Sequence, residues 1–90
     1  QAVENAPDSP SAHRALGQVQ FRRDELEAAR RHLRIALDAG GPSATLLERL
    51  GDVEAALGND TAAQTYWQRA LDRNPDRSSL REKLAVPANS

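Results

Sequence analysis

The chain has 90 residues, the size of one small domain, and it contains no cysteine, which excludes disulfides and thiolate metal sites. Its 12 basic and 13 acidic side chains nearly cancel, so no bulk field attracts nucleic acid or an anionic membrane. No apolar run approaches the roughly 18 residues that span a bilayer. We therefore expect neither nucleic-acid binding nor membrane insertion.

The first two helices are predicted from their ends. Ser9 followed by Pro10 is a typical helix start, because serine caps the helix and proline fits its first turn. The residues 24–27 resemble a capping box that opens a second helix. Gly40-Gly41-Pro42 ends that helix, since glycine favours the left-handed conformation that follows a helix.

Three more helices follow by the same signals. Ser43 caps the third helix, which Gly58 closes, and Asn59 or Asp60 opens the fourth. Asn74-Pro75 ends the fourth helix, because proline lacks the amide donor that a helix needs. We expect Asp76 to cap a short fifth helix that Pro87 stops. No segment alternates with a period of two, so we expect no strands.

The chain repeats itself without a gap when residues 10–43 are placed against 44–77. The matched positions are nearly all small or apolar, as expected where packing limits the choice of residue. They are Leu16/Leu50, Gly17/Gly51, Val19/Val53, Ala28/Ala62, Ala29/Ala63, Ala36/Ala70, Leu37/Leu71 and Asp38/Asp72. Gly17 and Gly51 lack a Cβ, so we expect a neighbouring helix to approach closely at each.

A helix–turn–helix unit that repeats every 34 residues resembles the tetratricopeptide repeat family. In the second unit the family's pattern is carried by Leu47, Leu50-Gly51, Ala63, Trp67, Ala70 and Pro75. In the first unit it is carried by His13, Leu16-Gly17, Ala29, Leu33 and Ala36. The family's tyrosine-like position is polar in both units, as Gln20 and Glu54.

The resemblance implies an all-α fold, a right-handed superhelical stack of antiparallel helix hairpins, which is a tetratricopeptide-like α-solenoid. It also implies a division of the chain. We expect the end of a preceding repeat at 1–7, a first repeat at 8–42, a second at 43–75, a capping helix at 76–86 and a tail at 87–90.

The sequence shows no constellation of catalytic or metal-binding residues. His13 and His32 have no histidine or carboxylate four residues away, so neither forms a chelate on one helix face. "GGPS" lacks the lysine of a phosphate-binding loop, and no nucleophile elbow is present. We therefore predict no enzyme, no cofactor and no metal. His13 and Trp67 are interpreted as packing residues.

Five arginines form a basic cluster, interpreted as a solvated helix face with Glu27 pairing to Arg30 or Arg31; the alternative is a phosphate or nucleic-acid patch. They are Arg22, Arg23, Arg30, Arg31 and Arg34.

The family binds partners along the first helix of each unit, and the resemblance carries this role to seven positions. They are Arg14, Gln18, Phe21, Arg22, Glu48, Arg49 and Asp52. Some members clamp a peptide carboxylate with Lys and Asn, which Arg14, Gln18 and Arg49 match only in part. Phe21 is interpreted either as a partner contact or as packing against a preceding repeat.

Three functions remain open. The first is a non-catalytic scaffold that binds a peptide or helix in its concave groove. The second is self-association or assembly through exposed repeat edges, by which copies of the chain would form a homo-oligomer. The third is a regulatory appendage of a larger enzyme. The sequence identifies neither the partner nor the compartment.

Overall fold

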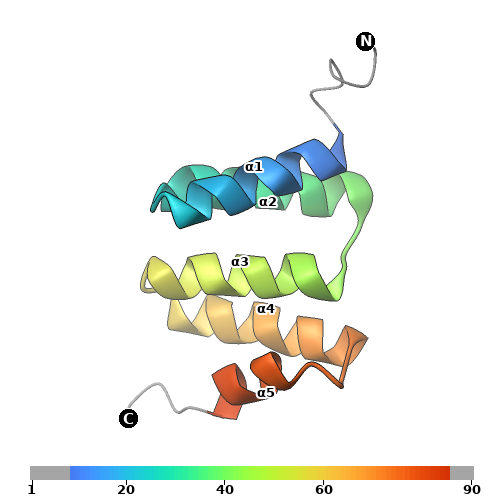
Figure 1. The fold of residues 1–90 in the computed structure, drawn as a ribbon. Helices are drawn as coiled ribbons and strands as arrows, with labels where there is room; N and C mark the ends of the chain where they lie inside the picture. Colours follow the sequence, from blue (N-terminus) through green and yellow to red (C-terminus); the bar gives the residue numbers. More distant parts are fainter. Residues whose placement is uncertain (1–8, 86–90) are drawn as a thin grey trace. The chain divides into compact units, whose positions relative to one another are not determined.

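The computed structural model describes residues 9–85, and all the regular structure in this range is helical. Five helices follow one another as α1 (Pro10–Arg22), α2 (Leu26–Gly40), α3 (Ala44–Ala56), α4 (Asp60–Arg73) and α5 (Ser78–Ala85) (Figure 1). They form two compact units, with the boundary between Pro42 and Ser43. The all-α expectation is confirmed, whereas the division into repeats at the stated residues stays a prediction.

The first unit is the hairpin of α1 and α2, which lie side by side and run in opposite directions (Figure 1). The apolar stripe of α2 is buried at Ala29, Leu33 and Ala36. On α1 the buried residue is Gly17. The hairpin thus packs one apolar helix face against a helix that offers backbone rather than bulk.

The second unit contains the hairpin of α3 and α4 together with α5, which packs against α4 (Figure 1). Its buried side chains come from all three helices. They are Leu46, Leu47, Leu50, Val53, Ala63, Ala70 and Leu80. Leu80 of α5 is completely buried, and Leu84, one turn further along, is half-buried.

Three predicted helix starts are confirmed, at Pro10, Ala44 and Asp60, whereas those at 24–27 and Asp76 differ. Ser43 Oγ accepts the backbone N–H of Leu46 at 3.1 Å, as expected for a cap. Ser9 occupies the cap position of α1, but its side chain makes no capping bond. Asp76 is not the cap of α5, because that helix begins only at Ser78.

The predicted capping box at 24–27 is wrong, because Asp24 ends the preceding turn instead of starting α2. Asp24 has a left-handed backbone, with φ 64°. The N–H of Asp24 donates to the carbonyl of Phe21, and the N–H of Glu25 donates to the carbonyl of Gln20. This pair of bonds is the Schellman arrangement that satisfies the last carbonyls of a helix.

The second unit closes α3 with the same arrangement at the equivalent residues. Gly58 has φ 88°, and its N–H donates to the carbonyl of Ala55. The N–H of Asn59 donates to the carbonyl of Glu54. Asp24 therefore stands where the second unit has glycine, and an L-residue with a Cβ is strained in this conformation.

One glycine in each hairpin, Gly17 or Gly51, sets the distance between its two helices. A Cβ on Gly17 would lie 2.6 Å from Cγ of Leu33 and 3.3 Å from the carbonyl oxygen of Ala29. A Cβ on Gly51 would overlap the indole ring of Trp67. Both glycines are therefore required by the close approach of the neighbouring helix, as predicted.

Ala12, Leu16 and Val19 share one face of α1 as an apolar stripe, and this stripe is not buried. Leu16 and Val19 each remain 46% exposed, whereas Leu50 and Val53, at the equivalent positions of α3, are fully buried. The two units therefore share a sequence pattern but differ in how the same face is covered.

Replacing Gly51 by alanine is expected to destabilise the protein by about 1–3 kcal/mol, because the new methyl group displaces the indole of Trp67. Alanine is more favourable than glycine in a helix by about 1 kcal/mol, so the measured loss of stability is the cost of the clash minus this gain. Urea denaturation checks the change. In the background of Trp67→Leu the same substitution should cost less, and an equal cost in both backgrounds would contradict the assigned contact.

Replacing Asp24 by glycine is expected to stabilise the protein by about 0.5–1 kcal/mol, because relief of left-handed strain exceeds the greater chain entropy of glycine. Thermal unfolding measures the shift. Asp60→Gly, an exposed position within α4, serves as the control and should destabilise instead. A loss of stability with Asp24→Gly would refute the strain at this position.

Candidate functional site

The first unit presents its predicted site residues along α1. Arg14 and Arg22 are exposed, and Gln18 and Phe21 are half-buried. These two arginines are the only residues of α1 with a formal charge, so the helix carries a formal charge of +2. Among the described residues neither arginine has a carboxylate within ion-pair distance.

In the second unit, α5 binds the predicted site residue Glu48 of α3. Its carboxylate is almost completely buried. It accepts hydrogen bonds from Nε of Arg77 at 3.0 Å, from Nη2 of the same residue, and from Oγ of Ser79 at 2.9 Å. The ammonium group of Lys83 lies 2.8 Å from Oε2, the oxygen that Ser79 also binds.

The same lysine connects this cluster to Asp52 and Trp67. Nζ of Lys83 donates to Oδ1 of Asp52 at 2.7 Å and lies 5.8 Å from the centre of the indole ring. The indole N–H of Trp67 donates to the same carboxylate oxygen at 3.1 Å. We call Glu48, Asp52, Trp67, Arg77, Ser79 and Lys83 the α5 clamp.

The pKa values follow from these contacts. Burial alone would raise the pKa of Glu48, but hydrogen bonds from Lys83, Arg77 and Ser79 outweigh it and lower the pKa to about 2. Burial would likewise lower the pKa of Lys83, but its bonds to Asp52 and Glu48 raise it. Glu48 and Lys83 are therefore both charged at neutral pH, and each has a counterion within hydrogen-bond distance.

The charge of the first helix reverses between the two units. The three acidic residues of α3 are Glu48, Asp52 and Glu54, and with Arg49 they give the helix a formal charge of −2. The equivalent residues of α1 are Arg14, Gln18 and Gln20. The polar surface of α3 is thus acidic and is bound by basic side chains of the same chain, whereas the polar surface of α1 is basic.

A family model described as Tetratricopeptide repeat matches residues 1–44 and again 14–78. The chain belongs to the tetratricopeptide repeat family. Tetratricopeptide repeats generally mediate protein–protein interaction and are typically non-catalytic, so a protein partner is implied. Searches of curated proteins and of solved structures found no significant match.

The remaining predicted site residue, Arg49, lies on α3 of the second tetratricopeptide hairpin. It is half-buried, and its Nε has no hydrogen-bond partner among the described residues. A buried donor without an acceptor is costly.

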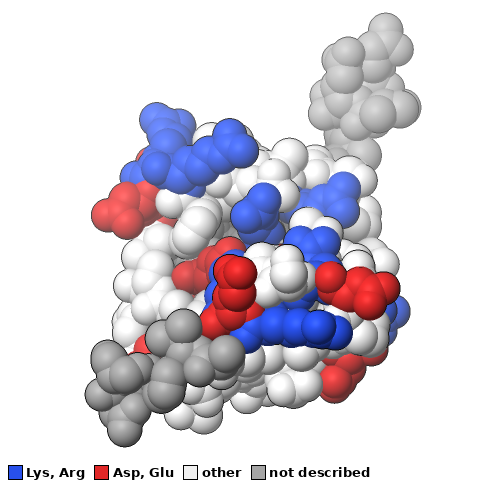
Figure 2. All heavy atoms as spheres, turned by 60° about the horizontal axis from the view of Figure 1, so that its bottom comes forward, with Lys and Arg blue, Asp and Glu red and all other residues white. Residues whose placement is uncertain are grey.

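Sequence reasoning missed the pairing of α5 with α3. Arg77 and Lys83 bind Glu48, which lies 29 and 35 residues away in the sequence. The available signal in the sequence was the opposite charge of two segments, the acidic one at 44–56 and the basic one at 77–83. Figure 2, in which this end of the molecule comes forward, shows basic and acidic side chains beside one another.

The two histidines meet between the helices of the first hairpin. Their rings stack with centroids 5.5 Å apart, and Nδ1 of His32 lies 2.7 Å from Oε1 of Gln20. Both ring nitrogens of His13 are buried without a partner in the described chain. The packing role predicted for His13 agrees with this contact. No group of three metal-ligating side chains occurs among the described residues.

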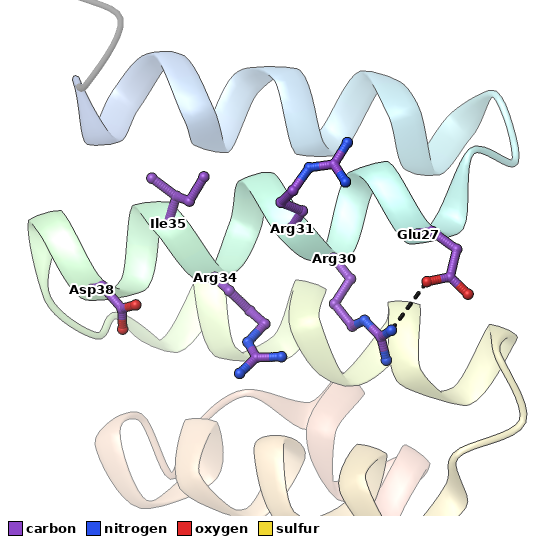
Figure 3. A pocket seen from close by; sticks show the side chains of 6 residues that line it. All are labelled: Glu27, Arg30, Arg31, Arg34, Ile35 and Asp38. Atoms are coloured by element: carbon purple, nitrogen blue, oxygen red, sulfur yellow. Dashed lines mark hydrogen bonds and ion pairs between the residues drawn. The ribbon is translucent and has the colours of Figure 1, made fainter.

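Three arginines of the cluster, Arg30, Arg31 and Arg34, line an open hollow on α2 (Figure 3). Arg30 binds Glu27 at 3.1 Å, which is one of the two pairings that the spacing predicted. Arg31 and Ile35 point towards the side of α1, and Arg30 and Arg34 point the opposite way (Figure 3). Within residues 9–85 no helix is long and apolar enough to cross a bilayer.

Replacing Glu48 by glutamine should destabilise the protein by about 2 kcal/mol at neutral pH, because Arg77 and Lys83 lose their buried counterion. Denaturation followed by the fluorescence of Trp67, the only tryptophan, measures this loss. The same change at an exposed position of α5, Glu82→Gln, is the control and should have little effect.

The pH dependence of stability tests the same group. Glu48 has a lowered pKa in the folded state, so its stabilisation is complete above about 4.5 and is lost as the pH falls towards about 2. The wild-type protein should therefore lose more stability over this range than Glu48→Gln. Parallel pH profiles for the two proteins would show that this carboxylate does not hold α5.

Proposed function

We propose that this protein is a non-catalytic interaction scaffold that binds an extended acidic segment of another protein along the first helices of its units. The proposed contacts are made by Arg14, Gln18, Phe21 and Arg22 on α1 and by Glu48, Arg49 and Asp52 on α3. In this family such residues line the concave groove.

The formal charge of α1 is the observation that carries the proposal. Arg14 and Arg22 are exposed and have no carboxylate within ion-pair distance among the described residues. A partner that brings carboxylates would supply what these guanidinium groups lack, and arginine binds carboxylate through two parallel hydrogen bonds.

The α5 clamp supports the same reading by analogy within the chain. It shows a first helix whose polar face is bound by a second segment of opposite charge. Glu48 and Asp52 are already paired with Arg77 and Lys83, and as carboxylates they do not attract an acidic segment, whereas Arg14 and Arg22 of α1 do. The acidic partner should therefore bind mainly to the first unit.

The test uses two synthetic peptides of equal length, one of alternating Glu and Gly and one of alternating Lys and Gly. Their binding to the whole chain is measured by isothermal titration calorimetry. The acidic peptide should bind more tightly, and Arg14→Glu with Arg22→Glu should weaken it about tenfold, a loss of roughly 1.4 kcal/mol.

Arg34→Glu with Arg69→Glu is the matched control, since both residues are exposed arginines on the second helices. It changes the net charge equally and should leave most of the affinity. An equal loss with both double variants would show that only net charge attracts the peptide, and the assignment to α1 would then fail.

A further inference from the structure

The two histidines of the chain are far apart in the sequence but meet in the first hairpin. His13 belongs to α1 and His32 to α2, and the centres of their rings are 5.5 Å apart with 21° between the ring planes. Neither residue has a histidine or carboxylate four residues away, so no chelate forms on one helix face. The fold instead brings one imidazole from each helix to the same place.

The separation of the two rings is the one that a shared metal ion requires. Zn²⁺ binds an imidazole nitrogen at about 2.0–2.1 Å, so two rings on one tetrahedral ion have their centres about 5–6 Å apart. The ring centres of His13 and His32 fall within this range. The two helices therefore already hold the imidazoles at a distance at which one ion contacts both.

A hydrogen bond to Gln20 determines which nitrogen of His32 is free to bind a metal. Nδ1 of His32 lies 2.7 Å from Oε1 of Gln20, and an amide oxygen only accepts, so Nδ1 carries the proton. Nε2 therefore keeps its lone pair. Metal-binding histidines typically donate their other N–H to such an acceptor, which orients the ring. His32 thus has the tautomer and the support that a zinc ligand needs.

The ring of His13 has no hydrogen-bond partner of its own. Both of its nitrogens are buried, and neither is bonded within residues 9–85. One nitrogen of a neutral imidazole is an acceptor, and a buried acceptor without a donor costs free energy. The equivalent residue of the second unit is Leu47, which is almost completely buried. The first unit therefore has a metal-ligating ring at a position where leucine is sufficient for packing.

We propose that His13 and His32 bind one Zn²⁺ ion between α1 and α2, with water completing its tetrahedral shell. Both histidines are half-buried, so solvent reaches the pair. Their neighbours Arg14 and Arg31 are basic, and α1 contains no acidic residue. Nitrogen ligation rather than negative charge therefore holds the ion. Mg²⁺, which prefers oxygen ligands, should not compete.

The test is a calorimetric titration of the whole chain with zinc chloride at neutral pH. One ion should bind per chain, and His13→Leu and His32→Tyr should each weaken the binding at least tenfold. Leu47 and Tyr66 occupy these positions in the second unit, so both variants introduce residues that this type of hairpin accepts. Circular dichroism checks that each variant folds.

Two further measurements distinguish a shared ion from other binding. Zn²⁺ should raise the unfolding temperature of the wild-type protein, because it links the two helices of the folded hairpin, but not that of either histidine variant. Gln20→Met removes the acceptor of the Nδ1 proton and should weaken zinc binding about tenfold. Gln64→Met, on the exposed face of α4, is the matched control and should leave the affinity unchanged.

If a histidine variant loses helicity, NMR of the wild-type protein decides the question. The imidazole signals of His13 and His32 should shift together in one transition during the zinc titration. Shifts of one ring alone would contradict a shared ion.

Four other results would overturn the inference. Absence of zinc binding would show that the pair is no metal site. Loss of only half the binding in each histidine variant would show that the two rings bind ions independently. Equal binding of Mg²⁺ would show that nitrogen ligation does not select the ion. Zinc-dependent dimerisation in sedimentation experiments would place the ion between two copies of the chain instead of between α1 and α2.

Discussion

The close approach of two helices at a glycine is the constraint on which each hairpin depends. At Gly51 the indole of Trp67 occupies the space that a Cβ would take, and at Gly17 the side chain of Leu33 does so. This contact fixes which faces of the two helices meet. It therefore also decides which residues of α1 and α3 remain available to bind other groups.

Within this shared frame the two units differ in charge and in cover. The polar face of α3 is acidic and is bound by the basic residues of α5, which lowers the pKa of Glu48 to about 2. The polar face of α1 is basic, and its apolar stripe is half exposed. The acidic face of the second unit is thus bound by its own chain, whereas Arg14 and Arg22 of the first unit have no carboxylate within ion-pair distance among the described residues.

The helices and their family could be predicted from the sequence because local signals agree with the repeat. Ser43, Gly58 and Pro75 stand where a helix must start or stop, and the glycine and alanine positions recur without a gap. The capping box at 24–27 was wrong because Asp24 takes a left-handed conformation that the second unit gives to glycine. Asp24 followed by Glu27 has the same sequence pattern as a capping box, although Asp24 does not cap α2.

The α5 clamp and the exposed stripe could not be predicted for a different reason. Arg77 and Lys83 reach Glu48 across 29 and 35 residues, and no local pattern encodes such a contact. Periodicity shows that Leu16 and Val19 share one face with Ala12, but it does not show whether anything covers them. The role of the seven site residues stays a prediction that rests on the family resemblance.

The central claim is that α1 is the helix open to acidic partners and that α3 is already bound by α5. Amide chemical shifts of the whole chain, followed by NMR during titration with the alternating Glu-Gly peptide, test it most directly. The account predicts that the shifts change along α1, around Arg14 and Arg22, while those of α3 and α5 stay nearly constant. Changes concentrated on α3 and α5, with α1 unaffected, would contradict it.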